Sequence, residues 1–263
     1  LASLRGAICR LEAETMPHDA QRVALGHADA DALLQGGLMR GVLHEVFATQ
    51  TRQSAAATGF VAGIAERLAK QRTLLWVRQD FVEREAGILS MSGLAELGLN
   101  PRRLVLVRAT DAEAALRVAA DGLACDALGA VVLDLWGEVR TFDLVASRKL
   151  TMAAQTSGVP CVMLRTSALP EVSTAETRWI IRAARSPPVP EWSAWGSPVL
   201  DAELVRNRHG QTGQWIMEWN CDECLFREPA AYSQPVVAAP ADRPHQAPVV
   251  ARGEIARFNR RAG

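Results

Sequence analysis

A short polar segment follows the first strong apolar run of the chain, where a phosphate-binding loop would lie. Residues 48–56 read ATQTRQSAA, between an expected strand and an expected helix. A phosphate loop needs Gly for close backbone approach, Lys for the phosphates and Ser or Thr for Mg²⁺. This segment has neither Gly nor Lys; it offers the cation Arg52 and the hydroxyls of Thr49, Thr51 and Ser54. Because charged hydrogen bonds to phosphate contribute about 1.5–3 kcal/mol each, we predict no tight nucleotide binding here.

The apolar run AVVLD places Asp134 at the expected carboxyl end of a strand. Ligands of parallel α/β sheets bind at that edge. A carboxylate in this position is typical of an Mg²⁺ site, but it is also a common way for a strand to close, here beside Trp136. The sequence leaves both interpretations open. With Thr51, Arg52 and Ser54, Asp134 defines at most a degenerate nucleotide site.

Two arginines mark the end of a late strand in the segment LVRNRHGQTG, residues 204–213. Arg206 and Arg208 lie two apart, so on a continuous strand they share one face with Leu204. HGQTG is expected to be the turn that follows. One interpretation is a contact with a partner or a like subunit through Arg206, Asn207 and Arg208. The other is a solvated strand end, worth under about 1 kcal/mol in any surface pairing.

Two further groups of residues were weighed as sites. Trp192 and Trp195 lie in the Pro-rich segment 186–198, expected to be a surface loop, and are candidates for a partner contact. Cys221 and Cys224 form a single C-x-x-C, whereas a structural zinc needs four ligands. We interpret this pair as two thiols after the last strand and expect no metal site; the alternative is a metal shared across a dimer. The odd total of five cysteines favours a reducing cytoplasm over a disulfide framework.

The elements that must position these residues alternate along the chain. Near-continuous apolar strands separated by helices predict a parallel sheet covered on both faces. The last two strands alternate apolar and polar residues, which predicts an antiparallel edge. The expected strands are 42–47, 73–77, 104–108, 130–135, 161–165, 177–183, 199–206 and 214–219; the expected helices are 55–70, 83–97, 112–124 with Asp111 as its N-cap, and 142–156 ended by Gly158.

The composition of the chain excludes some classes of protein and indicates how the chain is divided into regions. The 263 residues carry 29 basic and 29 acidic side chains, which excludes a generally basic nucleic-acid coat. We see no apolar run long enough to span a membrane and no secretory signal, and we expect a cytoplasmic protein. The predicted organisation is an N-terminal helix and linker (1–30), an α/β core (31–228) and a disordered, Pro/Ala-rich basic tail (229–263).

The order of motifs resembles the RecA-type ATPase core. GVLHEVF (41–47) stands where such proteins carry the strand before the phosphate loop, AVVLD (130–134) at their Mg²⁺-site strand and ASRKL (146–150) at the next helix. LVRNRHGQTG resembles their basic hairpin, where a Lys/Arg pair reaches the neighbouring subunit's nucleotide. More closely, the chain resembles the ImuA family, RecA-like proteins of bacterial SOS mutagenesis cassettes, over roughly residues 1–219. The segments that carry this are GGLMRGVLHEVF (36–47), LLWVRQDF (74–81), LAELGLNPRRLVLVRA (94–109), TFDLVASRKLTMAA (141–154) and STAETRWII (173–181).

The resemblance implies a fold, a function and partners. The fold is a RecA-like core with a mainly parallel sheet flanked by helices and an antiparallel C-terminal edge. The function is that of an accessory factor in translesion synthesis, acting with an ImuB-type Y-family polymerase-like protein and an error-prone C-family DNA polymerase, and associating with RecA.

Departures from the active ATPases concern catalysis. The position of the catalytic Glu corresponds to about Gln79, which cannot act as a base, the sensor Gln falls near Thr166, and the DNA-binding loop is shortened to about 167–176. We therefore expect a non-catalytic adaptor without cofactor, with weak DNA binding as a compatible property. The alternative is an active RecA/RadA-type DNA-dependent ATPase in recombination or repair.

Overall fold

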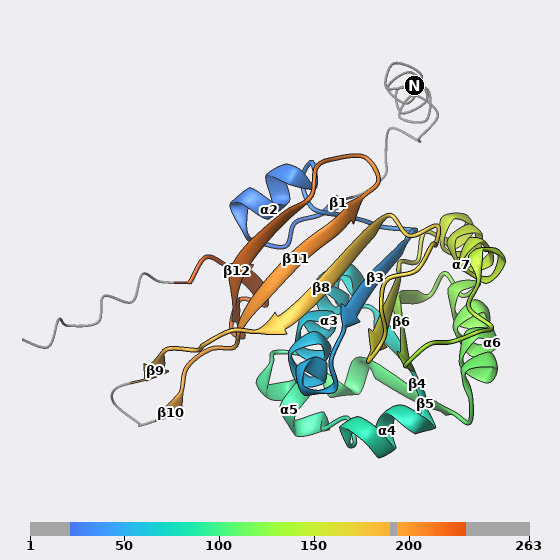
Figure 1. The fold of residues 1–263 in the computed structure, drawn as a ribbon, viewed down its shortest axis with the longest axis horizontal. Coiled ribbons are helices and arrows are strands. Elements are labelled where there is room, and N and C mark those ends of the chain that lie inside the picture. Colours follow the sequence, from blue (N-terminus) through green and yellow to red (C-terminus); the bar gives the residue numbers. More distant parts are fainter. Residues whose placement is uncertain (1–21, 190–193, 230–263) are drawn as a thin grey trace, which may run out of the picture. The chain divides into compact units, whose positions relative to one another are not determined.

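A nine-stranded sheet forms the centre of the described chain, in the order β13-β12-β11-β8-β3-β7-β6-β4-β5 (Figure 1). The computed structural model describes residues 22–189 and 194–229. Strands β8, β3, β7, β6, β4 and β5 run parallel, and β11, β12 and β13 add antiparallel strands at one edge. The fold class predicted from the sequence is therefore confirmed. The strands are β3 (Leu43–Ala48), β4 (Thr73–Gln79), β5 (Leu104–Ala109), β6 (Leu128–Trp136), β7 (Cys161–Thr166), β8 (Thr177–Ala183), β11 (Val199–Asn207), β12 (Gly213–Asn220) and β13 (Leu225–Arg227).

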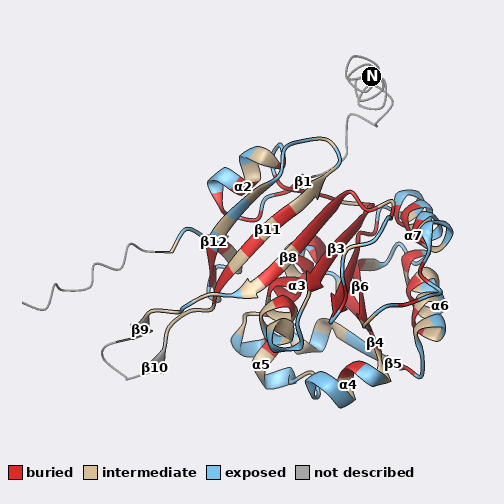
Figure 2. Cartoon of the chain, in the orientation of Figure 1, coloured by how far each residue is buried: buried red, intermediate tan, exposed pale blue. Residues whose placement is uncertain are grey.

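Helices cover both faces of the parallel part of this sheet. Helix α3 (Ser54–Ala69) packs on one face through the predicted stripe of Phe60, Ile64 and Leu68, all fully buried. Helices α6 (Ala112–Leu123) and α7 (Leu144–Ser157) cover the other face. Each face thus forms its own apolar cluster, and strands β3, β4, β6 and β7 are buried on both sides, whereas the edge strand β5 is partly exposed (Figure 2).

The long helices α6 and α7 begin and end close to the positions predicted from the sequence. Asp111 caps α6, because its Oδ1 accepts a hydrogen bond from the backbone N–H of Ala114 at 2.8 Å. Helix α7 ends at Gly158, which adopts the left-handed conformation with φ of 74°. Asp143 caps the start of α7 through the N–H of Ala146 at 2.8 Å. Both helices on this face are therefore fixed at defined positions.

The helix predicted over 83–97 is instead two short helices, so that prediction was wrong. Helix α4 (Asp80–Ala86) ends at Gly87, whose φ of 82° is outside the helical region. Helix α5 (Met91–Glu96) starts afresh, with Ser90 accepting the N–H of Gly93. Gly relieves the strain of positive φ, and Ser competes for helix N–H groups, so the two residues together interrupt the apolar periodicity.

The packed core begins before residue 31, which is the core boundary predicted from the sequence. Strand β1 (Arg22–Val23) pairs with β2 (Leu38–Met39) around helix α2 (Ala28–Leu33). Val23, Leu25 and Ala30 are buried in the same apolar cluster as α3. The expected N-terminal helix and most of the expected tail fall in 1–21 and 230–263, outside the described residues.

Short elements complete the described part of the chain. The turn η1 (Thr51–Gln53) follows β3, and η2 (Pro101–Arg103) precedes β5. Strands β9 (Pro188–Val189) and β10 (Ala194–Trp195) pair with each other within the segment predicted to be a surface loop. Among the helices in the described ranges, none has the length and apolar character required to cross a bilayer.

Candidate functional site

The segment after β3 is a tight turn rather than a cradle for phosphates. Thr51 and Arg52 are exposed in η1, and Ser54 is the half-buried first residue of α3. The neighbouring Gln53 uses its Oε1 to accept the backbone N–H of Ala183 at 2.7 Å, which ties the turn to β8. A turn without glycine, held in this way, does not bring a row of N–H groups around a phosphate.

Asp134 lies inside β6 and not at its end, which corrects the sequence-based placement. The strand continues through Leu135 to Trp136, because Leu135 fills the apolar cluster under α6 and α7. Asp134 faces the opposite side, toward α3, with Trp76 and Val132. By strand alternation Trp136 follows on that same face and stands between Asp134 and the edge of the sheet. The carboxylate itself is fully buried.

A guanidinium from the adjacent strand occupies the position beside this carboxylate. Arg78 pairs with Asp134 across β4 and β6, and its Nε lies 3.1 Å from Asp134 Oδ2. The indole N–H of Trp76 donates to the same oxygen at 3.3 Å. Burial raises the pKa of Asp134 to about 6, while Arg78 and the Trp76 hydrogen bond act in the opposite direction. The charge of Asp134 is therefore balanced by protein groups.

These residues do not fit an Mg²⁺ ion with a nucleotide. Mg²⁺ requires oxygen ligands in nearly octahedral geometry with access for water and phosphate. Asp134 is enclosed, Arg78 brings a positive charge to its carboxylate, and the β3 turn supplies no lysine. The second interpretation of Asp134, a structural carboxylate, is the one that the geometry favours.

The strand ends around this position are joined to one another. Gln79, at the expected position of a catalytic carboxylate, accepts the backbone N–H of Trp136 at 3.2 Å. Thr166, at the expected position of the sensor residue, is buried at the end of β7 between Ala48 and Trp136. The ring of Trp136 lies 6.3 Å from that of Phe81. The side chains expected to sense or activate a ligand thus pack within the protein.

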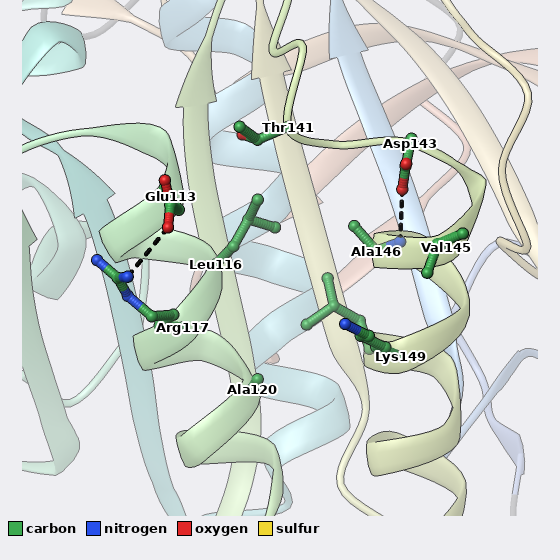
Figure 3. A pocket seen from close by; sticks show the side chains of 10 residues that line it. Glu113, Leu116, Arg117, Ala120, Thr141, Asp143, Val145, Ala146 and Lys149 are labelled. Atoms are coloured by element: carbon green, nitrogen blue, oxygen red, sulfur yellow. Dashed lines mark hydrogen bonds and ion pairs between the residues drawn. The ribbon is translucent and has the colours of Figure 1, made fainter.

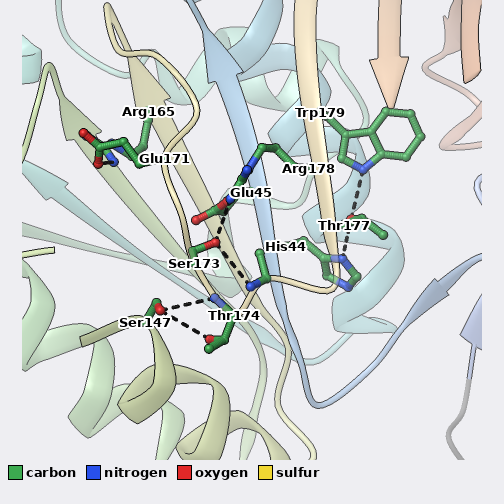
Figure 4. A network of polar contacts seen from close by, with 11 residues as sticks. His44, Glu45, Ser147, Arg165, Glu171, Ser173, Thr174, Thr177, Arg178 and Trp179 are labelled. Atoms are coloured by element: carbon green, nitrogen blue, oxygen red, sulfur yellow. Dashed lines mark hydrogen bonds and ion pairs between the residues drawn. The ribbon is translucent and has the colours of Figure 1, made fainter. Parts of the chain in front are cut away.

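The loop over 167–176 is held against the sheet and α7 by polar contacts (Figure 4). Arg165, fully buried, pairs with Glu171 at 3.1 Å and has its guanidinium 5.8 Å from the rings of both Phe47 and Phe142. The backbone N–H of Thr174 donates to Ser147 Oγ at 3.2 Å. The shortened loop is therefore fixed at two places.

A β-bulge changes the direction of Arg206, contrary to the sequence prediction. The pairing of β11 with β8 shifts between Leu204 and Arg206, so that Leu204 faces Trp179 while Arg206 faces Arg178. The extra residue turns Arg206 away from the buried stripe of Leu204. Arg208 lies in the turn after the strand, where its backbone N–H donates to the carbonyl of Glu176 at 2.9 Å. The face predicted to be shared with Leu204 is therefore wrong for Arg206, and Arg208 lies beyond the strand, although both arginines remain near Glu176.

Arg206 instead joins a charged cluster at the start of β3 and β8. Arg178 Nε lies 2.7 Å from Glu45 Oε2, and Arg178 also donates to Ser173 Oγ at 2.8 Å. Burial, and then the nearby Arg178, lower the pKa of half-buried Arg206. Burial raises the pKa of Glu176, against the effects of His209, whose Nε2 lies 3.5 Å away, and of Arg208. Arg178 and Arg206 therefore lie close to each other at this rim, and both are near Glu45.

The remaining predicted residues are distributed elsewhere. Asn207 donates through its amide to the carbonyls of Leu33 and Gln211, both at 3.1 Å, which fixes the turn and the end of α2. Trp195 lies on β10, and Trp192 falls outside the described residues. Cys221 and Cys224 are free thiols in the turn between β12 and β13. The structure does not bring these residues together with Arg206.

Sequence reasoning missed three charged residues that define these sites: Arg78, Glu45 and Arg178. Each is a charged residue within a mainly apolar strand, and each is buried. A buried charge requires a partner of opposite sign, so the isolated Arg of TLLWVRQ was a usable signal. Its partner could not be identified without the strand order.

The described fold defines a RecA-like core: a parallel sheet between α3 and the α6–α7 pair, with an antiparallel edge. The crystal structure of the RadB recombinase shares this fold, with a TM-score of 0.53 and 15% identity, over 79% of this chain and 99% of that chain. Protein ImuA of Caulobacter vibrioides, in strains NA1000 / CB15N and ATCC 19089 / CIP 103742 / CB 15, is 31% identical over 199 residues, which cover 70% of this chain and 77% of the relative. The chain therefore belongs to the ImuA family. No protein-family model matches it.

Proposed function

We propose that this chain is a non-catalytic, RecA-like accessory protein of SOS-induced, error-prone translesion DNA synthesis. Membership of the ImuA family supports the pathway, and the geometry of the strand ends supports the lack of catalysis. The protein acts in the cytoplasm through partners. These are an ImuB-type Y-family polymerase-like protein, an error-prone C-family DNA polymerase, and RecA.

One observation carries the non-catalytic assignment: Arg78 is paired with Asp134. In phosphoryl transfer the metal ions neutralise the developing charge, and a carboxylate must be free to hold them. Here the carboxylate faces a guanidinium at 3.1 Å and is fully buried. Entry of Mg²⁺ would place two cations beside one carboxylate, which is electrostatically unfavourable.

Two further contacts support the same proposal. Gln79 holds the N–H of Trp136, so it orients the backbone and cannot serve as a base toward water. The loop over 167–176 is fixed by Glu171 and Thr174, whereas a loop that folds around DNA needs freedom to reorganise. An adaptor gains from rigidity of this kind, because a fixed surface loses less entropy when a partner binds.

The test compares nucleotide chemistry with mutagenesis in cells. ATP and a non-hydrolysable analogue are titrated calorimetrically into the purified protein at up to millimolar concentration, and ATP turnover is measured with and without single-stranded DNA. A strain lacking the protein is then complemented with wild type or with the double variant Arg52→Ala and Ser54→Ala. We expect no binding, no turnover and equal damage-induced mutation frequencies.

The alternative, an active DNA-dependent ATPase, gives the opposite results. DNA-stimulated turnover that the double variant loses, together with loss of damage-induced mutation, would establish the ATPase. Full mutagenesis in cells without this protein would remove the pathway assignment itself. An active RecA-type enzyme assayed in parallel is the positive control for turnover.

A further inference from the structure

The two edges of the sheet differ in length and in cover. Strand β13, at one edge, spans three residues, and its Phe226 is fully buried. Strand β5, at the other edge, spans six residues and pairs with β4 alone among the described strands (Figure 1). One row of backbone N–H and C=O groups along β5 therefore points away from the sheet. We call this outer side of residues 104–109 the β5 edge.

Apolar side chains of the β5 edge are exposed on both faces of the sheet. Leu104 packs against the apolar cluster that contains α3, and Val107 packs against the cluster of α6 and α7. By strand alternation, Leu106 lies on the face of Leu104, and Val105 lies on the face of Val107. Leu106 is 38% exposed and Val105 is 47% exposed. The helices on either face thus leave part of this strand uncovered.

Strand β5 lacks the features by which proteins ordinarily block such an edge. These features are a very short strand, proline, a β-bulge, or charged side chains along the strand. β5 contains no proline, its register with β4 has no shift, and its one charged residue, Arg108, is next to its last position. An open, apolar strand of this kind is suited to pairing with a strand of another chain.

The start of the β5 edge is positively charged. Arg102 and Arg103 lie in the turn η2, which leads into the strand. Arg103 pairs with Glu66, and Arg103 Nη2 lies 3.2 Å from Glu66 Oε1. Arg102 is exposed and forms no ion pair with any of the described residues. Two cations therefore share one carboxylate at this end.

The end of the β5 edge is negatively charged. Arg108 Nε lies 3.2 Å from Asp80 Oδ1 and 3.1 Å from Glu83 Oε2, both on α4. Asp111, the N-cap of α6, follows directly after the strand and the exposed Thr110. Three carboxylates thus accompany one guanidinium at this end, which is the reverse of the balance at the start.

From the open backbone and the opposite charges of its ends, we infer that the β5 edges of two copies of this chain pair antiparallel in a symmetric dimer. A two-fold axis perpendicular to the sheet keeps like faces together, so residues that face each other have the same parity. With the axis at Leu106, Val105 of each copy faces Val107 of the other, and such apolar cross-strand contacts stabilise a sheet. The same axis brings the Arg102 end of each copy to the Asp111 end of the other.

Other arrangements at the β5 edge fit less well. A parallel pair of copies would bring like-charged ends together, which is unfavourable. Head-to-tail pairing of β5 with β13 of another copy would be limited to the three residues of β13. A strand of a different protein would use the same backbone groups, but an antiparallel second copy supplies both complementary charges by symmetry.

A second open surface lies between helices α6 and α7, where the chain forms a hollow of about 370 Å³ (Figure 3). Its charged lining consists of two carboxylates and two cations: Glu113, Asp143, Arg117 and Lys149. Because the two signs are equal in number, these charges do not select a partner of either sign. Val145, which also lines the hollow, provides a control site outside the β5 edge.

The experiment is sedimentation velocity of the purified full-length chain from low to high micromolar concentration. The test variant carries Val105→Lys with Leu106→Lys, because lysine in an edge strand opposes pairing with another strand. Its matched control is Val145→Lys with Ile216→Lys, at side chains that are 60% and 48% exposed on α7 and β12. Thermal melts establish that each variant is folded.

Two further measurements test the dimer without adding lysine to the strand. Arg102→Glu should weaken association, whereas Arg148→Glu, at another exposed arginine, should not. A short thiol-specific cross-linker should join two copies of Leu106→Cys far more than two copies of wild type or of Val145→Cys, because position 106 faces its own equivalent at the axis. These measurements decide the question if the double lysine variant fails to fold.

We expect wild type and the sedimentation controls to dimerise reversibly, and the double lysine variant and Arg102→Glu to associate at least about tenfold more weakly. A wild-type chain that stays monomeric throughout would overturn the inference. A dimer that the folded lysine variant and Arg102→Glu both leave unchanged would overturn it too, as would equal cross-linking of Leu106→Cys and Val145→Cys.

Binding to the polymerase-like partner separates the remaining occupant. If wild type is monomeric and the double lysine variant loses this binding, a strand of the partner occupies the β5 edge and the inference is overturned. None of these outcomes contradicts the proposed function, which is tested by nucleotide chemistry and damage-induced mutagenesis.

Discussion

The two faces of the sheet each carry a buried ion pair between neighbouring strands, and the pairs differ in their surroundings. On the α3 face, Arg78 and Asp134 are 5% and 0% exposed, and the indole of Trp76 adds a hydrogen bond. On the other face, Arg178 and Glu45 are similarly buried, but the half-buried Arg206 lies beside them. The first pair has one cation for one carboxylate, whereas the second adjoins a surplus of cations.

The two ion pairs therefore differ in whether their charge can act on groups outside the fold. An enclosed pair of one cation and one carboxylate presents no net charge to the solvent. A cluster with surplus guanidinium groups at the rim retains an electric field that extends into solvent. The β-bulge at Val205 creates the surplus, because it places Arg206 next to Arg178 instead of along the apolar stripe. We therefore propose the second site as the one suited to a contact between proteins.

The largest expected effect is on association through the charged cluster at the start of β3 and β8. Replacing Arg206 and Arg208 together by Ala should weaken binding to RecA or to a second copy of this chain by about 2–5 kcal/mol, the usual cost of truncating charge contacts at interfaces. Folding should be nearly unchanged, since Arg206 is half-buried and lies beside Arg178, whose charge, after burial, lowers its pKa. Sedimentation velocity and a RecA pull-down measure association, and a thermal melt measures folding.

The control for that experiment is Ile88→Asp, a substitution at a 76% exposed side chain between α4 and α5. Unchanged oligomer size and unchanged RecA binding in the double Arg variant would leave Arg206 and Arg208 as a solvated strand end.

The second effect concerns the enclosed pair and stability. Arg78→Met removes the cation and leaves Asp134 buried beside apolar groups. We expect the free energy of unfolding, from urea titration at pH 8, to fall by about 2–3 kcal/mol. Adding Asp134→Asn should recover most of the loss, because no charge then remains to be buried. An Arg78→Met chain as stable as wild type would show that this pairing has no energetic role.

The pH dependence of stability provides a third, smaller effect. Burial raises the pKa of Asp134 from 3.8 to about 6, so the folded state holds this proton more tightly than the unfolded state. The stabilisation from this group is complete below about pH 4 and is lost as the pH rises through 6. The reference is the double variant Arg78→Met with Asp134→Asn, which buries neither charge. Relative to that variant, we expect wild type to lose on the order of 2 kcal/mol of stability between pH 4 and pH 7.5. A stability difference between the two proteins that does not change with pH would contradict a raised pKa.

The smallest expected effect is at the turn after β3. Arg52→Ala with Ser54→Ala should leave the melting temperature unchanged with and without millimolar ATP, since Arg52 is exposed and Gln53 holds the turn. An ATP-dependent rise in the melting temperature of wild type that the variant lacks would show that this turn still binds phosphate.

Much of the fold could be predicted because local patterns decide it. The stripe of Phe60, Ile64 and Leu68 and the cap at Asp111 depend on residues close in sequence, and both were predicted correctly. The interruption at Gly87 was missed because the apolar spacing on either side suits a single helix. The bulge at Val205 leaves no local signal, because it exists only in the pairing of β11 with β8.

The candidate site was harder to predict because its chemistry depends on strand order. Asp134 was identified as a residue of interest, but the role of its carboxylate is decided by Arg78, which lies 56 positions earlier and one strand away. The same holds for Glu45 and Arg178, which meet only because β3 and β8 are neighbours. Residue type indicates that a buried charge needs a partner, and topology determines which partner it has.

The Arg78–Asp134 pair also has a consequence for the substitutions that this chain can accept over time. Under the non-catalytic function proposed above, metal binding at Asp134 would require the prior loss of Arg78. That intermediate would carry a buried, unpaired Asp134 and would be less stable. Marginal stability leaves little room for such a step. Loss of Arg78 alone is therefore expected to be selected against, whereas exposed positions remain free to change.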